Sequence, residues 1–284
     1  MGFSLLTFLF MLTITVTVIL ILIYTMNSED KLSEINNNLG LSSSSGKPYE
    51  LSVSQGEVNG KNTLYKYGYN GSVGTLEETI WTVGGNITWL TDASILSVTS
   101  DSGDDALGGT GARRIKIFGL DSNYSEITED IDLNGLAPVN TNNSFLRVFR
   151  SFVFDSGTGG VNVGTISIKD DNNVTLAEIT ETEGQTQMAV YTVPAGKKLY
   201  VDNINFTSAN TQGNRLTTIK LRTREEGTNT WRVKFINNLE SGQFNADFKY
   251  PLVYNEKTDI ECRGFNSSDT SLVSATFQGV LIDT

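Results

Sequence analysis

Apolar and polar residues alternate with a period of two from about residue 49 to the C-terminus, and this pattern most constrains the fold. Ile219 and Leu221, for example, alternate with Lys220. Clusters of Gly, Asn, Asp and Pro separate such segments, which is the spacing of short strands joined by turns. A helical pattern appears outside the N-terminal segment only in residues 30–39. The chain is therefore predicted to be all-β and built from antiparallel sandwiches.

The candidate strands fall into two groups of similar size. The groups are separated near Glu181–Gln185, a polar stretch containing Gly184 that suits a linker. We therefore expect two tandem antiparallel β-sandwich domains, jelly-roll-like, at residues 49–184 and 185–284.

The N-terminus carries a long apolar segment. Met1–Ser28 has no charged side chain, and Phe3–Tyr24 is apolar apart from Ser and Thr. At a rise of about 1.5 Å per residue these 22 or so residues span about 33 Å, the hydrocarbon thickness of a bilayer. A cleaved secretory signal would need a basic flank and a shorter apolar region. A retained transmembrane helix at residues 1–26 is predicted, with a cleaved signal or a buried soluble helix as the alternatives.

Residues 27–48 have the composition of a stalk. Asn36–Asn38 and the Ser42–Gly46 run are typical of a linker. The globular part is expected to begin near Tyr49.

The chain of 284 residues contains no His and one Cys, and its net charge is −11. Without His, the Ser-His-Asp and Cys-His nucleophile systems and His-ligated zinc are excluded. Because phosphate-backbone binding needs clusters of Lys and Arg, this acidic chain is a poor nucleic-acid binder. We expect no enzyme, no cofactor, no nucleic-acid partner and no small-molecule substrate.

Acidic side chains cluster in one loop. Asp101, Asp104 and Asp105 lie within five residues, and a hard cation such as calcium could use such carboxylates. The segment lacks the EF-hand pattern, so a solvated turn is the favoured interpretation and calcium the alternative. Asp170–Asp171 and the Glu181/Glu183 pair are interpreted in the same way.

Aromatic residues, the single Cys and the Asn sequons each have a structural and a functional interpretation. Trp81, Trp89 and Trp231 suit a sandwich core better than a sugar-stacking platform. Cys262 shares a strand face with Ile260 and is expected to be a small buried hydrophobe. Asn-X-Ser/Thr sequons, which matter only if the protein meets a glycosylation machinery, occur at Asn70, Asn86, Asn123, Asn142, Asn173, Asn205 and Asn266.

Two stretches resemble known proteins. Gly109–Phe154 (GTGARRIKIFGLDSNYSEITEDIDLNGLAPVNTNNSFLRVFRSFVF) is similar to a segment of uncharacterised virion structural proteins from marine tailed phages and large algal viruses. Tyr191–Asp283, with YTVPAGKKLYV, WRVKFINNLESGQFNADFKYPLVYNEKTDIECRG and SATFQGVLID, resembles the C-terminal half of the same proteins. The resemblance implies a β-sandwich virion component and supplies no catalytic residues. Those phage proteins lack an apolar N-terminal helix. Its presence in this chain implies a virus that has a lipid layer under its capsid.

The combined expectation is a virion protein that tethers an internal membrane to an icosahedral capsid. Its expected partners are the lipid bilayer and other capsid proteins, with self-association as a further interaction, and its expected location is the virion. The alternatives are a membrane-anchored adhesin or carbohydrate-binding module, a spike or attachment protein, and an anchored hydrolase. The loops expected to contact neighbours are Asp101–Gly111, Asp155–Gly160 and Glu225–Asn229.

The uncharged N-terminal run leads to a direct prediction. The full-length chain should enter the detergent phase and resist carbonate extraction, because its apolar segment matches the bilayer, whereas a chain starting at Tyr49 should stay in the aqueous phase. Phase partitioning followed by immunoblotting measures this. A full-length chain found in the aqueous phase contradicts the anchor, as does a mature protein that begins after residue 26.

Overall fold

The structure, a computed structural model, describes residues 47–210 and 215–284. The predicted transmembrane helix, residues 1–26, lies outside the described residues, as does nearly all of the predicted stalk. In the part of the chain that is described, no helix is both long and apolar enough to cross a bilayer.

The chain divides into two compact units, Met1–Asn62 and Thr63–Thr284. The described part of the first unit contains one short helix, α2 (Tyr49–Ser54), which follows Pro48. In this unit the Lys47 ammonium donates a hydrogen bond of 2.7 Å to the Glu57 carboxylate and thereby lowers its pKa.

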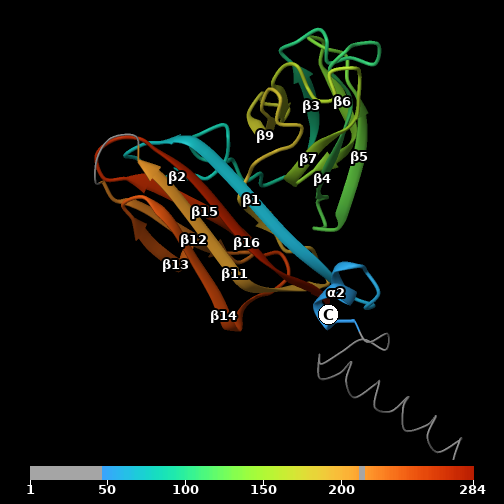
Figure 1. The fold of residues 1–284 in the computed structure, drawn as a ribbon. Coiled ribbons are helices and arrows are strands. Elements are labelled where there is room, and N and C mark those ends of the chain that lie inside the picture. The colour runs from blue at the N-terminus through green and yellow to red at the C-terminus, as the bar shows by residue number, and fades with distance from the viewer. Residues whose placement is uncertain (1–46, 211–214) are drawn as a thin grey trace, which may run out of the picture. The chain divides into compact units, whose positions relative to one another are not determined.

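Antiparallel strands make up most of the second unit, as the sequence predicted (Figure 1). Their bounds are β1 (Lys61–Val73), β2 (Glu78–Thr79), β3 (Ser94–Ser100), β4 (Ala112–Leu120), β5 (Glu126–Asp132), β6 (Val139–Phe145), β7 (Arg147–Ser156), β8 (Ile166–Lys169), β9 (Thr175–Ile179), β10 (Val190–Thr192), β11 (Lys197–Asn210), β12 (Thr217–Arg224), β13 (Arg232–Leu239), β14 (Gly242–Tyr254), β15 (Asp259–Asn266) and β16 (Ser271–Asp283).

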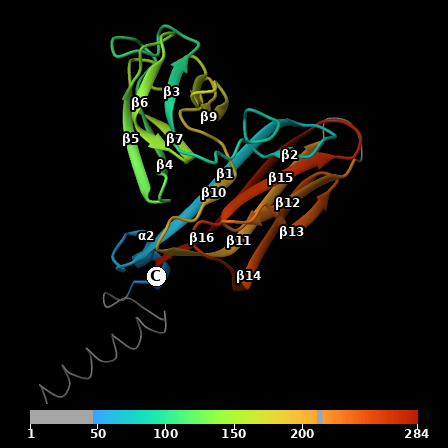
Figure 2. The ribbon, with the colours of Figure 1, turned by 180° about the vertical axis from the view of Figure 1, so that it is seen from behind.

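Two sheets enclose the first hydrophobic core. One has the strand order β1-β16-β11-β14, and the other has the order β10-β15-β12-β13 with β2 paired to β15. Figure 2 shows the second of these sheets from the side opposite to Figure 1. Side chains of both sheets meet in one cluster, in which Phe206 and Phe277 of the first sheet and Leu221 of the second are fully buried. We call this part, residues 63–81 and 188–284, the host domain.

Two further sheets enclose a second core. Their strand orders are β6-β3-β8-β9 and β5-β4-β7, and Ile115, Phe145 and Ile168 are among the fully buried side chains of their shared cluster. The chain enters and leaves this part at an antiparallel bridge between Trp81 and Met188. We call residues 82–187 the inserted domain.

The sheets do not follow the expected domain boundaries, 49–184 and 185–284. β1 and β2 precede the inserted domain in sequence, yet they pair with β16 and β15 of the host domain. The predicted break near residue 184 lies close to the exit from the inserted domain, but the order is an insertion, not a tandem. Strand pairing between distant segments leaves no local trace, because a strand alternates in the same way whichever strand it joins.

Close backbone approach fixes β1 in the host domain. A side chain at Gly68 would place its Cβ 2.3 Å from the Ala189 nitrogen and 2.3 Å from the Ile80 oxygen. Only glycine allows this contact, which holds β1 against the segments that flank the inserted domain.

The insertion leads to a prediction about fragments. Residues 185–284 alone should not fold, because without β1 and β2 the strands β16 and β15 lose a neighbour and the core loses Val73 and Ile80. Circular dichroism and proton NMR of that fragment measure this. A dispersed spectrum with cooperative melting would show that the host domain does not need its N-terminal strands.

Candidate functional site

Asp105, one of the three calcium candidates, is a buried structural carboxylate. Its side chain accepts hydrogen bonds from the backbone nitrogens of Ala112, Val163 and Gly164 at 2.7–2.9 Å, and from the Ser100 hydroxyl at 2.7 Å. The residue is completely buried. The Asp105 carboxylate therefore holds the Asp101–Gly111 loop against the start of β8, with its acceptor positions occupied.

The other two candidates do not join Asp105 in one site. Asp101 is exposed and accepts a hydrogen bond of 2.8 Å from the Thr165 nitrogen, and Asp104 is exposed as well. Among the described residues, no group of three or more Asp, Glu, Cys or His side chains is placed to hold a metal ion. The loop is an anchored turn in this structure.

Replacing Asp105 should therefore cost stability without any metal. Asp105→Asn is expected to lower the free energy of unfolding by about 2–4 kcal/mol, because charge-assisted bonds to buried donors are lost. Asp104→Asn, at an exposed position of the same loop, should change it by less than about 0.5 kcal/mol. Urea unfolding with and without a chelator measures both. A parent protein that is destabilised by the chelator would instead reveal a calcium site.

Two of the three loops expected to contact neighbours lie together. Gly157 and Gly159 donate backbone hydrogen bonds of 2.7 and 2.8 Å to the oxygens of Gly111 and Thr110. The Asp101–Gly111 and Asp155–Gly160 loops thus form one surface of the inserted domain. The Glu225–Asn229 loop belongs to the host domain, where Glu225 pairs with Arg232 at 2.8 Å.

A buried ionic cluster joins the two domains. Arg147 of β7 pairs with Asp259 of β15 at 2.9 Å, and both side chains are at most 8% exposed. Asp259 also pairs with Arg224 at 2.6 Å and accepts a hydrogen bond of 2.7 Å from the Thr192 hydroxyl. The Oδ1 atom of Asp259 accepts hydrogen bonds from Arg147 and Thr192, and the Oδ2 atom accepts them from Arg147 and Arg224. Both carboxylate oxygens therefore have a donor from the inserted domain. We call Arg147, Asp259, Arg224 and Thr192 the interdomain lock.

A second buried carboxylate lies two residues along the same strand. Glu261 of β15 is completely buried, accepts a hydrogen bond of 2.5 Å from the Thr79 hydroxyl, and pairs with Arg222 at 3.0 Å. Arg263 lies 3.7 Å from it. Burial lowers the pKa of Arg263, an effect that the Glu261 carboxylate opposes.

Two tryptophans cover the guanidinium groups of this region. The Trp89 and Trp231 ring centroids are 5.5 Å apart. Arg222 and Arg224 lie 4.4 and 4.9 Å from the Trp231 ring, and Arg147 lies 5.2 Å from the Trp89 ring. These rings lie over charged groups by cation–π contact. Trp89 also packs against the core of the inserted domain, as the core interpretation predicted, whereas Trp231 contacts the guanidinium groups and Trp89.

The buried ion pairs of this region connect the two domains. Because Arg and Thr donors occupy the carboxylate oxygens, the region is suited to charge pairing and not to proton transfer. Sequence alternation places Arg222, Arg224, Asp259 and Glu261 on one sheet face, and this is the only signal that could have found them. The pairing with Arg147, 112 residues away along the chain, has no sequence signature.

Breaking the lock should be costly. Asp259→Asn is expected to destabilise the protein by about 3–5 kcal/mol, because it leaves buried guanidinium groups uncompensated. The matched control is Asp132→Asn, whose pair with Arg114 at 2.8 Å is about half exposed and should contribute less than about 1 kcal/mol. Equal losses in urea unfolding would contradict the role of the lock.

Lys66 of β1 is a second contact between the domains. Its ammonium is buried, donates to the Phe149 carbonyl and lies 5.7 Å from the Phe149 ring centroid. Burial lowers the pKa of Lys66 to about 7, and the charge of Arg150 adds to this. Phe149 also packs edge-on against Tyr191, with ring centroids 4.9 Å apart.

The lowered pKa predicts a pH dependence. Between pH 7 and 10.5 the unfolded chain keeps the Lys66 proton that the folded chain has lost, so this residue raises stability as pH rises through that window. The stability of the parent relative to Lys66→Met should increase by a few kcal/mol across it, at about 1.4 kcal/mol per pKa unit. A difference that stays constant with pH in parallel melts would contradict a buried Lys66.

The other residues noted from the sequence are either buried in a core, bonded within their own turn, or exposed. Trp81 is buried in the core of the inserted domain and donates to the Gly84 carbonyl at 2.9 Å. Cys262 is buried in the host core, where burial raises its pKa. Asp170 is buried and its carboxylate accepts bonds from two backbone nitrogens of its own turn, while Asp171, Glu181 and Glu183 are exposed.

The sequons divide between the two domains. The exposed ones all lie in the inserted domain, and those of the host domain are buried or half-buried. The exposed asparagines are Asn86, Asn123, Asn142 and Asn173, and the others are Asn70, Asn205 and Asn266.

Most of the net negative charge of the chain lies in the inserted domain. The inserted domain contains 15 Asp and Glu against 6 Lys and Arg, so it accounts for −9 of the net charge of −11. The host domain has 12 of each and is neutral. The inserted domain is therefore the part that repels other anionic surfaces at long range.

Comparisons with known proteins add little. No known family profile and no curated protein matches the chain. Among solved structures, the chain has a likeness to infectious bursal virus derived T=1 particles at 13% identity and a TM-score of 0.21, covering 80% of this chain and 70% of that one. A TM-score this low establishes neither a fold nor a function.

Proposed function

We propose that the protein is a non-enzymatic structural component of a virion, which tethers an internal membrane to the capsid. The tether consists of an apolar N-terminal anchor, a stalk and two locked β-sandwich domains of jelly-roll-like type. The resemblance of Gly109–Phe154 and Tyr191–Asp283 to virion structural proteins supports this role.

The observation that carries the proposal is the interdomain lock. Arg147 lies in the first of the resembling stretches, and Asp259, Arg224 and Thr192 lie in the second. A protein that connects a bilayer to a shell transmits force between them, and a buried ionic joint between its domains prevents them from moving independently.

The arrangement also suits assembly without catalysis. The Asp101–Gly111 and Asp155–Gly160 loops lie together on the inserted domain and are the proposed contact with neighbouring capsid proteins. Polar loop surfaces of this kind form the rims of protein interfaces. The bilayer is the proposed partner of the N-terminus, and nucleic acid is not a proposed partner, since the chain is acidic.

Purified particles test this function. The protein is expected in the membrane fraction after mild disruption of virions, and residue-specific cross-linking followed by mass spectrometry should connect the two loops to a capsid protein. A matched control is cross-linking from the Glu225–Asn229 loop of the host domain, which should yield fewer capsid products. Absence from the particles, or capsid contacts without membrane association, would contradict the tether.

A further inference from the structure

Strand β13 is an unpaired edge of the host domain. In the sheet β10-β15-β12-β13 it pairs with β12, without a register shift from Phe235 to Leu239, and among the described residues no strand pairs with its other side (Figure 1). Its backbone therefore offers a free row of N–H and C=O groups, to which a further strand can add. β10, at the opposite end of this sheet, has only three residues.

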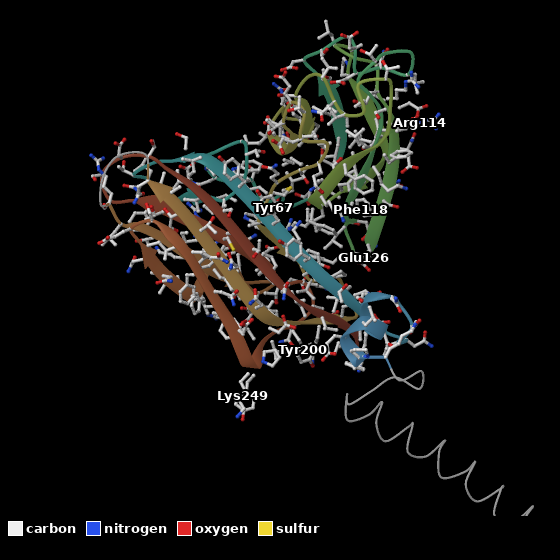
Figure 3. The ribbon with its side chains drawn as sticks, in the orientation of Figure 1. Tyr67, Arg114, Phe118, Glu126, Tyr200 and Lys249 are labelled. Atoms are coloured by element: carbon white, nitrogen blue, oxygen red, sulfur yellow. The ribbon has the colours of Figure 1, made fainter. Side chains whose placement is uncertain are left out.

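The neighbouring edge strand β14 is protected against strand addition. It carries Pro251, which cannot donate to a strand ladder, and Lys249, whose side chain extends away from the strand in Figure 3. β13 contains no proline and no glycine. Two of its apolar side chains, Val233 and Ile236, are each 52% exposed. Of the two edges, β13 is therefore the one at which another strand can pair.

The host core reaches the surface along this edge. Phe235 and Leu239 of β13 pack against the core but are only partly buried. Phe235 stacks with Phe244 of β14 at a ring-centroid distance of 5.5 Å, and Phe248 packs edge-on against it at 6.0 Å. A strand added to β13 would place its own side chains beside this row and remove more of the apolar surface from water.

The sequence of β13 is complementary to itself. When two copies pair antiparallel about a two-fold axis at Asn237, Phe235 lies opposite Leu239 of the other copy. The same register places Lys234 opposite Glu240, which directly follows the strand. Apolar side chains thus meet apolar ones and opposite charges meet, and the symmetry gives each of these pairs twice.

A two-fold axis one residue earlier, at Ile236, gives a poorer match. It places Phe235 opposite a polar residue of the other copy. It also places Glu240 opposite Arg232, whose charge is already paired with Glu225 at 2.8 Å. The axis at Asn237 is therefore the favoured register.

The Asn237 amide suits a position on the axis. Its oxygen accepts a hydrogen bond of 2.8 Å from the Asn238 nitrogen, and its amide nitrogen has no partner among the described residues. Because an amide both donates and accepts, two Asn237 side chains that meet at the axis can bond each other. Such a polar pair within an apolar seam fixes the register, as a buried Asn pair does in coiled coils.

Lys234 and Glu240 lack a charged partner within one chain. Both are exposed, and in residues 47–210 and 215–284 neither forms an ion pair. A lysine on an edge strand opposes the addition of an arbitrary strand. It favours a strand that places a carboxylate opposite it, which the Glu240 of a second copy does. The charge pattern therefore selects a copy of this chain over an unrelated strand.

We propose that β13 pairs antiparallel with β13 of a second copy, so that the sheet β10-β15-β12-β13 continues across a two-fold axis at Asn237. The contact joins two host domains and does not use the loops of the inserted domain. It goes beyond the tether, which requires no second copy. Because the paired segment is short, the contact is a weak one in solution.

Disulfide trapping of the full-length protein in detergent tests this pairing. The single native cysteine, Cys262, is completely buried, so an introduced cysteine reports alone. Opposed residues of antiparallel strands have Cα atoms about 4.5–5.5 Å apart, which a disulfide can span. Asn237→Cys should therefore give a disulfide-linked dimer under mild oxidation, seen on non-reducing gels. The matched control is Val253→Cys, at a β14 position that is 53% exposed, which should give none.

Charge reversal tests the register in the Asn237→Cys background. Lys234→Glu places like charges opposite each other at two positions and should weaken dimerisation about tenfold. The readout is the protein concentration at which half of the chains are cross-linked. Adding Glu240→Lys restores opposite charges and should return this concentration to its original value. Circular dichroism confirms that each variant is folded.

Four results would overturn the proposal. They are the absence of a dimer with Asn237→Cys, equal cross-linking by Val253→Cys, stronger cross-linking by Ile236→Cys, and no recovery in the double charge reversal. Cross-linking of Asn237→Cys in virions to a different protein in place of a second copy would also overturn it, because the edge would then belong to another partner. Such a result would leave the tether intact.

Discussion

Asp259 is a carboxylate buried between two domains, and its neutralisation couples them. Burying an isolated charge costs several kcal/mol, and only close, hydrogen-bonded partners offset that cost. Arg224 and Thr192 come from the host domain, but Arg147 comes from the inserted one. Asp259 therefore has one cationic partner within the host domain and a second from the inserted domain, whereas the buried Arg147 has its carboxylate partner only across the domain boundary, which couples the stability of the two domains.

Smaller contacts reinforce the same coupling. Phe149 lies between Lys66 and Tyr191 of the host domain, and the Tyr124 carbonyl accepts a hydrogen bond of 2.9 Å from Ala195. The domains nevertheless differ in character, because the inserted one carries the acidic charge and the exposed sequons. A neutral domain beside an acidic one suits a protein whose two parts meet different surroundings, which is consistent with the proposed tether.

The sequence predicted the strand content well and the connectivity poorly. Alternation located long strands such as β11 and β16, because their inner faces are continuous apolar rows. Alternation does not mark β6, because its sequence Val139–Phe145 is polar between its two apolar ends. The expected boundary at residue 184 also put β1 in a different domain from β16, with which it pairs, since partner choice is set by contacts such as Gly68 against Ile80. The lock was hidden for the same reason: Arg147 alone resembles any charged strand residue.

Because the lock joins the two domains of the second unit, they should unfold together. Differential scanning calorimetry of the unmodified protein at neutral pH tests it most directly, because coupled domains melt in one transition whose calorimetric and van't Hoff enthalpies agree. The lock predicts a single transition in which the ratio of the calorimetric to the van't Hoff enthalpy is near one. Two resolved transitions, or a calorimetric enthalpy about twice the van't Hoff value, would show that the inserted and host domains unfold independently and that the lock does not couple them.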